Sequence, residues 1–408
     1  MKKFHYKAQG PTGVVIDDII DAENQESAIE KIRATGATPV SISEEKKKNL
    51  SINIPFLDNM LHKVKIQDKV VFAKNLSRML QAGLTVSRSL EVLKKQTDKT
   101  EFVVVLDSLI AEINSGGSLS GGMAKNPKVF SPVFVAMVRT GEESGNIPGN
   151  LIEVAKQLDK TYALRKKIKG AMIYPSVIVS AMMVIGVLMF IFVVPTLIQT
   201  FKDFDLDLPA TTRAVVFVSD LVSNSPLVVL GVLVGVVVSA VSIFRMKSLQ
   251  PHFDLLSTKL PIVGTIVKEF NSALATRTLA SLLGSGLNIN QALTVTKDVL
   301  QNFHYKKTID VAIHNVEQGD QLSKVFKDNI KLYPVMVGEM ISVGEETGNL
   351  SDMLGDVAEF FEDEVDSKTK NLSTIIEPVL MLLVGAGVGF FAVSMMSPMY
   401  SILDSIGA

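Results

Sequence analysis

Two nearly identical turns contain the residues of this sequence whose types and spacing best suggest chemistry. Residues 141–146 read Gly-Glu-Glu-Ser-Gly-Asn, and residues 344–349 read Gly-Glu-Glu-Thr-Gly-Asn. The second glycine of each turn is typical of the left-handed residue that ends a helix, and the asparagine after it is typical of a helix start. The residues predicted to build these turns are Gly141, Gly145, Asn146, Gly344, Gly348 and Asn349.

The adjacent glutamates of each turn need a separate explanation. They lie at the C-terminal end of a predicted helix, where the helix dipole disfavours negative charge. The same unfavourable placement occurs twice, which favours salt bridges to a partner protein, to the other copy or to a cation. We therefore take Glu142, Glu143, Glu345 and Glu346 as candidate partner contacts. The alternative is that they are solvated surface residues.

Other patterns that could do chemistry are weak. The glycine-rich segments 114–118 and 145–149 do not match a phosphate-binding loop and follow no predicted strand. The sequence has no cysteine and shows no nucleophile-elbow pattern. Its histidines lack metal-ligand spacing; they are His5, His62, His252, His304 and His314. We predict no catalytic residue, cofactor or metal, and no enzymatic activity.

An ionisable residue also stands where an apolar run begins. Glu377 precedes Pro378 at this point, and an acid at the mouth of a membrane span is a functional candidate by default. We favour a structural interpretation, in which Glu377 reaches the interface and pairs with Lys368 or Lys370. A role in proton relay is the alternative.

The whole pattern is duplicated. Shifting the chain by 203 residues, the difference between Gly83 and Gly286, superimposes the two glutamate turns and places Pro175 on Pro378. No gap is needed over more than a hundred residues, which indicates an internal duplication. Matched prolines near the starts of two apolar runs predict matched bends in membrane helices.

Three uncharged apolar runs are long enough to cross a membrane. One lies between Lys169 and Lys202, one between Glu377 and Asp404, and a third over residues 221–244. About 20 apolar residues suffice for a spanning helix. The first and last runs end the two repeats, and the middle run belongs to neither. Because the middle span returns the chain across the membrane, we expect both repeats on one side.

Flanking charges predict which side that is, since cytoplasmic loops are rich in lysine and arginine. The inner cations are Arg165, Lys166, Lys167, Lys169, Arg245, Lys247, Lys368 and Lys370. The segment between the first two spans is mildly acidic, and the tail after the last has only Asp404. We expect a cytoplasmic N-terminus and an outer C-terminus. Met1 to Tyr6 have cations without an apolar core behind them, so we expect no cleavable signal peptide.

The remaining pattern is strand-like at the start and helical afterwards. Two extended runs flank Gly10 to Gly13, a helix follows Asn24, and a short strand begins at Pro39. From Asp68 onward the periodicity is helical, with glycine and proline between segments. We predict an all-α membrane protein of two tandem six-helix cytoplasmic bundles, three transmembrane helices and a small N-terminal ββαβ module.

The predicted organisation runs in chain order. It comprises an N-terminal ββαβ module (1–50), a linker (51–67), the first cytoplasmic repeat (68–170), transmembrane helix 1 (171–200), a short outer segment (201–220), transmembrane helix 2 (221–244), a cytoplasmic linker (245–270), the second repeat (271–373), transmembrane helix 3 (374–403) and an outer tail (404–408).

These motifs together resemble a known family. The segments Leu76–Leu84 and Leu279–Leu287, the doubled turn, Glu377-Pro378 and the Ser-Pro-Met-Tyr at residues 397–400 are similar to the inner-membrane platform protein of type IV pilus and type II secretion machines, the F-type secretion family. The resemblance covers residues 1 to about 405. One departure is Tyr174, which stands where the second copy has the acid.

The resemblance implies a role and partners. It implies a cell inner-membrane platform without catalysis that contacts a cytoplasmic hexameric ATPase and pilin or pseudopilin subunits. It also implies other inner-membrane assembly proteins as partners, a homodimer or larger assembly, contact with membrane lipid, and no direct contact with nucleic acid. Pilus assembly, protein secretion and DNA uptake all remain open. The alternatives from other classes are an oligomeric membrane transporter or channel subunit, and a receptor.

Overall fold

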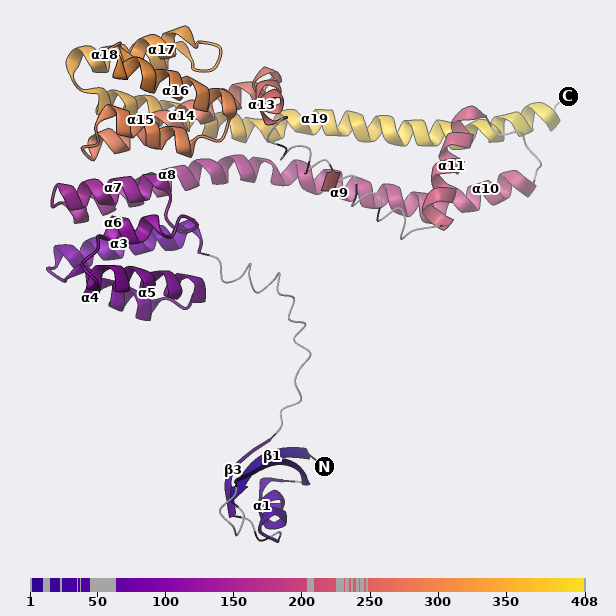
Figure 1. Ribbon diagram of the computed structural model, residues 1–408. Coiled ribbons are helices and arrows are strands. Elements are labelled where there is room, and N and C mark those ends of the chain that lie inside the picture. The colour runs from indigo at the N-terminus through magenta and orange to yellow at the C-terminus, as the bar shows by residue number, and fades with distance from the viewer. Residues whose placement is uncertain are drawn as a thin grey trace. The chain divides into compact units, whose positions relative to one another are not determined.

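The computed structural model describes most of the chain. The described residues are 2–9, 15–22, 24–34, 36, 38–44, 64–203, 209–224, 231, 235, 238–239, 242, 246 and 249–406. They are mostly helical, and the chain divides into a unit of residues 1–63 and a unit of residues 64–408 (Figure 1). Each unit is described by itself.

The first unit is a small sheet with one helix. Its elements are β1 (Lys2–Gln9), β2 (Val15–Ala22), α1 (Gln25–Ala34) and β3 (Thr38–Glu44), in the predicted order. Both other strands pair antiparallel with β1, which gives the sheet order β2-β1-β3. Ala28 and Ile32, four residues apart on α1, are buried beside Ala22 and Ala8 of the sheet. The predicted turn at 10–13 and the amphipathic part of the linker lie outside the described residues.

The first copy of the duplication is helical from Ile66 onward. Its helices are α3 (Ile66–Gln81), α4 (Val86–Gln96), α5 (Thr100–Asn114), α6 (Leu119–Ala124), α7 (Pro132–Glu143) and α8 (Ile147–Ala171). Side-chain caps explain several starts, since Thr85 accepts a hydrogen bond from the backbone of Arg88 and Ser118 from that of Gly121. Gly83 and Gly116 end two of the helices with left-handed backbone.

The second copy repeats this plan after helix α13 (Gln250–Lys259). Its helices are α14 (Val263–Gly284), α15 (Ile289–Val299), α16 (Phe303–Glu317), α17 (Leu322–Asp328), α18 (Val335–Thr347) and α19 (Leu350–Ile406). Equivalent ion pairs recur: Lys94 binds Asp107 and Lys297 binds Asp310, each at 2.5 Å. The duplication seen in the sequence is therefore also a duplication of tertiary contacts.

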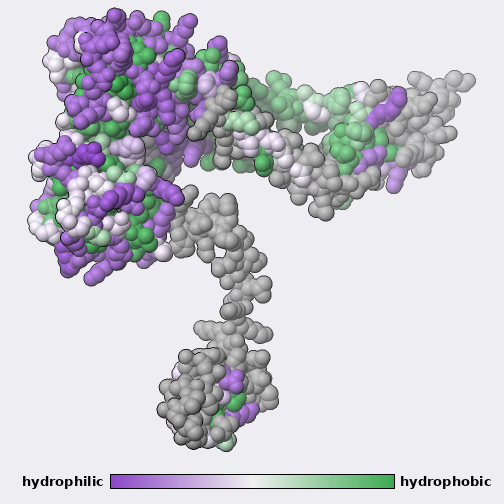
Figure 2. Space-filling view, in the orientation of Figure 1, coloured by the Kyte–Doolittle hydropathy of each residue, from purple (hydrophilic) through white to green (hydrophobic). Residues whose placement is uncertain are grey.

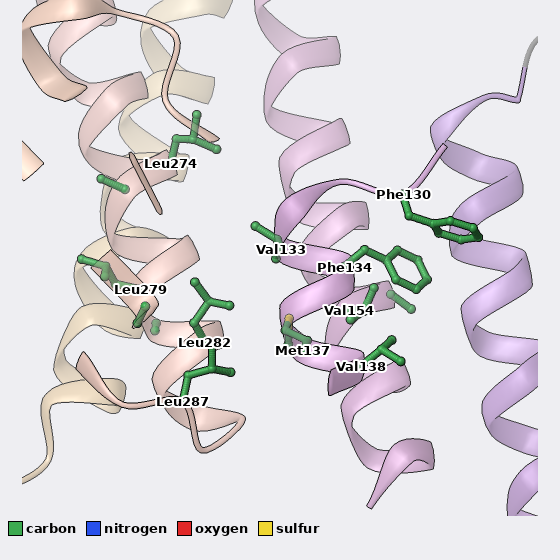
Figure 3. Packing of buried hydrophobic residues seen from close by; sticks show 14 of the residues in the cluster. Phe130, Val133, Phe134, Met137, Val138, Val154, Leu274, Leu279, Leu282 and Leu287 are labelled. Atoms are coloured by element: carbon green, nitrogen blue, oxygen red, sulfur yellow. The ribbon is translucent and has the colours of Figure 1, made fainter. Parts of the chain in front are cut away.

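Aromatic side chains at equivalent positions fill the two cores. In the first copy, Phe72 lies 5.5 Å from Phe102 and 5.8 Å from Phe130 between ring centroids. In the second copy Tyr305 and Tyr333 replace Phe102 and Phe130, and their ring centroids are 5.0 Å apart. Edge-on packing of such rings stabilises a core beyond the area that it buries. Buried apolar side chains of α7 and α14 belong to one hydrophobic cluster, in which Phe134 and Val138 of α7 point away from α14 (Figure 3).

Two long helical stretches carry the copies into apolar sequence. After α8 the chain continues as α9 (Ile173–Leu188), the short π-helix η1 (Met189–Val193) and α10 (Val194–Asp203). Within the described part of the chain, Ile147–Thr200 and Leu350–Met396 are long and apolar enough to cross a membrane. Where it is coloured, the surface of the two stretches beyond the copies is largely hydrophobic (Figure 2). The predicted middle span at 221–244 lies mostly outside the described residues.

Helix α11 (Ala210–Asn224) crosses the predicted boundary between the outer segment and the middle span. The Thr212 hydroxyl donates to the Ser394 carbonyl at 2.5 Å, and the Ser219 hydroxyl donates to the Phe190 carbonyl at 2.9 Å. Both acceptors lie within the predicted first and third spans. Residues 210–220 therefore pack against the spans as a helix, a contact that hydropathy alone does not reveal.

A glycine substitution tests the close packing between α18 and α19. A Cβ at Gly344 would lie 2.9 Å from Leu350 Cα, whereas a Cβ at Gly355 would meet nothing within 4 Å. We expect Gly344→Ala to destabilise the protein by about 1–3 kcal/mol because backbone atoms must move. The control Gly355→Ala should be neutral or stabilising by about 0.5–1 kcal/mol, as in other helix interiors. Thermal unfolding of the purified protein, followed by circular dichroism, measures both, and equal melting temperatures would contradict the packing.

Candidate interaction site at the repeated turns

The first glutamate of the first turn is bound within the chain. The Glu142 carboxylate accepts hydrogen bonds from the backbone N–H groups of Leu119, at 2.5 Å, and Ser120, at 3.2 Å. The Ser120 hydroxyl donates to it as well. These N–H groups belong to the first turn of α6, where a helix has no acceptors of its own. Glu142 therefore caps α6 from the end of α7.

The second copy has the same arrangement. The Glu345 carboxylate accepts from the backbone N–H of Leu322 at 2.5 Å and of Ser323 at 3.2 Å, at the start of α17. The carboxylate at the negative end of one helix thus lies at the positive end of another, which removes the electrostatic conflict seen in the sequence. A single offset of 23 residues separates each glutamate from its leucine partner. That spacing was the signal that sequence reasoning missed.

The two glutamates of each turn therefore have different roles. Glu142 and Glu345 are half-buried helix caps, so their carboxylates already have hydrogen-bond partners within the chain, and a contact with a partner protein stays a prediction for them. Glu143 and Glu346 are exposed and remain candidate partner contacts. Their surroundings differ, because Glu143 lines a cavity of about 290 Å³ between α7 and α15 and Glu346 does not.

The glycines of the turns allow close packing and a sharp reversal. Gly145 has a φ of 71° and Gly348 a φ of 73°, a conformation that glycine adopts without strain. A Cβ at Gly141 would lie 3.0 Å from the Cα of Ile147, so α7 and α8 approach closely there. The Asn146 side chain accepts from the backbone N–H of Gly149 at 3.1 Å and caps α8. These residues set the angle at which the long helix leaves the turn.

The acidic segment after the second turn is neutralised by the first copy. Lys160 of α8 lies 3.5 Å from Glu362, and Lys167 lies 3.2 Å from Asp366, both on α19. Hydrogen bonds from Lys370 and Lys167 hold the pKa of the Asp366 carboxyl below its ordinary value. Glu362 and Asp366 are therefore paired with lysines of the first copy.

A polar contact that the sequence did not suggest joins the copies more deeply. The Gln157 amide on α8 donates to the Thr278 hydroxyl at 3.2 Å and accepts from the Ser281 hydroxyl at 3.0 Å, both on α14. The Gln157 side chain is buried. Nearby in the sequence of α14, Arg277 binds the Glu362 carboxylate of α19 through two nitrogens, at 2.8 and 3.0 Å. A buried amide with both functions satisfied specifies the register of the two helices.

Glu377 does not take the partners expected of it. Lys368 binds Glu269 and Glu364, and Lys370 binds Asp366 at 2.8 Å. The predicted pairing of Glu377 with these lysines is therefore wrong, because Glu269, Glu364 and Asp366 bind them. Pro378 lies within the unbroken helix α19, whereas Pro175 lies three residues after the boundary of α8 and α9 at Met172. The helix is interrupted three residues before the first proline and continues through the second.

Among the described residues, no cluster of three or more histidines or acids could hold a metal ion. His304 hydrogen-bonds to the Pro251 carbonyl at 3.0 Å, and His314 to the Gln318 amide at 3.0 Å. The His304 bond connects α16 with α13, and the His314 bond lies within one turn at the end of α16.

Comparison with known proteins agrees with the duplication. The type II secretion system protein F family matches residues 72–195 and 275–398, and the N-terminal domain of the same family matches residues 1–43. The chain is 32% identical over 409 residues to type IV pilus assembly protein PilC of Thermus thermophilus, covering 100% of this chain and 99% of that protein. It is 28% identical over 404 residues to PilC of Myxococcus xanthus, covering 99% and 96%. It is 26% identical over 403 residues to type II secretion system protein F of Vibrio cholerae, covering 98% of each.

Alanine substitutions distinguish the two glutamates of a turn. Glu345→Ala removes two charge-assisted hydrogen bonds from α17 and should destabilise the protein by about 1–3 kcal/mol. Glu346→Ala removes only an exposed side chain and should change stability by less than about 0.5 kcal/mol. Thermal unfolding of the purified variants provides the comparison. If Glu346→Ala were the more destabilising of the two, the assignment of Glu345 as the cap would be incorrect.

Proposed function

The chain belongs to the type II secretion system protein F family, and from this we propose that it is the inner-membrane platform of a pilus or secretion machine. In this role it has no enzymatic activity. It couples a cytoplasmic hexameric ATPase to pilin or pseudopilin subunits that assemble in the membrane, and it works as a dimer or larger assembly with other inner-membrane assembly proteins. The observation that carries the proposal is the tandem family match over both copies.

Helix continuity supports a mechanical role. Helix α19 extends without interruption from the second turn at Leu350 to Ile406, and α8 passes into α9 with a break of one residue at Met172. A helix transmits a displacement along its axis through its hydrogen bonds. Because α8 and α19 contact each other, a movement imposed on either copy would reach both membrane helices (Figure 1).

The comparisons favour pilus assembly over protein secretion. Relatives named for pilus assembly are 28–32% identical to this chain, and those named for type II secretion are 24–27% identical. We propose that the chain acts with pilins.

We further propose three membrane crossings, with two six-helix copies in the cytoplasm and the C-terminus outside. The support is the positive rim at Arg165–Lys169 and at Lys368–Lys370, which immediately precedes the two apolar stretches. Residues 221–244 supply the third crossing in this arrangement.

Fusions to alkaline phosphatase test the topology. The enzyme is active only outside the cytoplasm, so fusions after Asp220 and at Ala408 should be active, and fusions after Lys247 and Lys368 inactive. Immunoblots serve as the control for equal amounts of each fusion. Activity after Lys247 would exclude the proposed arrangement.

Charge reversal at the exposed glutamates tests the contact with the ATPase. Glu346 is exposed outside the cavity that Glu143 lines, so Glu346→Lys should lower copurification of the cognate ATPase about tenfold or more and abolish pili. Glu143→Lys should have a smaller effect. Both variants should remain inserted, because exposed ion pairs contribute only about 0.2–1 kcal/mol.

A matched control for this experiment is Glu317→Lys. Glu317 is also exposed and lies at the C-terminal end of a helix, so its reversal makes the same change in charge elsewhere on the second copy. Normal pili and normal ATPase binding in Glu346→Lys, at wild-type membrane levels, would show that the exposed glutamates are only solvated.

A further inference from the structure

A cavity lies where the two copies meet the apolar stretches. Its volume is about 460 Å³, and it lies between the end of α8, the start of α14 and the part of α19 from Thr369 to Leu372. Ile168, Ile266, Phe270 and Leu372 make its wall largely apolar. Arg165 also lines it. The cavity therefore combines a hydrocarbon-like interior with a cation.

A shallower groove continues from this cavity along α9. The two share Lys169 and Met172, and the groove extends past Ser176 to Ser180. Eleven residues of helix from Lys169 to Ser180 rise about 16 Å, which is about half of the ~30 Å hydrocarbon core. The combined groove thus has the length of one leaflet.

The cations that line the groove differ from the neighbouring lysines in their ion pairing. Lys160 and Lys167 of α8 bind acids of α19, and Lys368 and Lys370 bind acids as well. Among the described residues, Arg165 and Lys169 form no ion pair. The nearby acid Glu269 is held by Lys368, and Asp366 by Lys167 and Lys370. Within the part of the chain that the structure describes, two positive charges therefore remain at the apolar groove without a counterion.

We propose that this groove binds an anionic phospholipid of the cytoplasmic leaflet. Arg165 and Lys169 bind its phosphate, and an acyl chain lies along Met172, Ser176 and Ser180. The proposal rests on the membrane placement proposed above, which puts the last cations before the spans at the depth of the headgroups. Arginine suits this role because its planar guanidinium binds phosphate oxygens in pairs.

Charge complementarity favours this occupant over others. A zwitterionic lipid would bring its own cation beside Arg165 and Lys169. An apolar helix of a second chain would bury both side chains against hydrocarbon without a counterion, which is unfavourable. A phosphate with attached acyl chains satisfies the cations and the apolar wall together. The lipid would also fill the junction of α8, α14 and α19, where cytoplasmic motion enters the membrane.

Lipid binding by the full-length protein tests the proposal. The purified chain, inserted in phosphatidylcholine nanodiscs, is titrated with phosphatidylglycerol, and bound lipid is measured by native mass spectrometry. Arg165→Gln with Lys169→Gln should weaken phosphatidylglycerol binding by about 30-fold, since each cation near an anionic lipid contributes about fivefold. The control pair Lys156→Gln with Lys166→Gln changes charge equally on α8, outside the groove, and should bind normally.

A second variant tests the apolar wall. Val267→Trp fills the cavity and leaves both cations in place, so it should also weaken binding, with thermal unfolding as a check that the chain remains folded. Undiminished binding in the Arg165/Lys169 variant, or equal uptake of an added phosphatidylcholine, would overturn the proposal. So would full competition by water-soluble glycerol phosphate, which would indicate a phosphate site without a lipid. A change in oligomeric state with lipid binding intact would instead indicate a second copy in the groove.

Failure of the lipid site and failure of the proposed membrane topology can be distinguished. A chain that inserts into nanodiscs and gives the expected phosphatase activities, but shows no preference for anionic lipid, refutes the lipid site alone. Failure of the fusions would refute the placement on which both proposals rest.

Discussion

The contact between α8 and α19 is the constraint on which the rest of the second unit depends. Each helix begins at a glutamate turn in one copy and continues into an apolar stretch, so the register of these two helices sets both copies and both candidate spans. The hydrogen bond of Gln157 aligns α8 with α14. The ion pairs of Lys160 and Lys167 align α8 with the acidic residues of α19. Exposed pairs of this kind contribute little stability individually, but the buried amide and the Arg277–Glu362 pair are specific because their polar atoms need particular partners.

The glutamate turns follow the same logic of matched charge. A carboxylate at the C-terminal end of α7 or α18 is unfavourable by itself, and it becomes favourable because the N-terminus of α6 or α17 lies beside it. A short helix has few internal hydrogen bonds, so an external cap matters more to it than to a long one. The capped short helix in turn packs against the helix that ends at the turn. Each turn therefore connects two helices through its first glutamate, and its second glutamate is exposed.

Much of this arrangement is readable from sequence because it is local or repeated. Helical periodicity, glycine at left-handed positions such as Gly145 and Gly348, and the order of elements in the first unit depend on neighbours in the chain. Because the sequence repeats after 203 residues, a pattern found in one copy can be checked in the other. The matched family segments, which begin at 72 and 275, have the same offset. The capping role of Glu142 and Glu345 is not predicted from the sequence, because their hydrogen-bond partners are 23 residues away and helical periodicity does not address that distance.

The sequence by itself determined the duplication, the helical character, the apolar stretches and the family, because these follow from residue type and spacing along the chain. Only the tertiary structure decided which of the charged side chains form ion pairs with one another. Lys160 and Lys167 pair with α19, Lys368 pairs with Glu269, and Arg165 and Lys169 are left beside an apolar groove. The physical reason is that a charge interacts through distance in space, and the packing of α8 on α14 and α19 brings together residues more than a hundred positions apart.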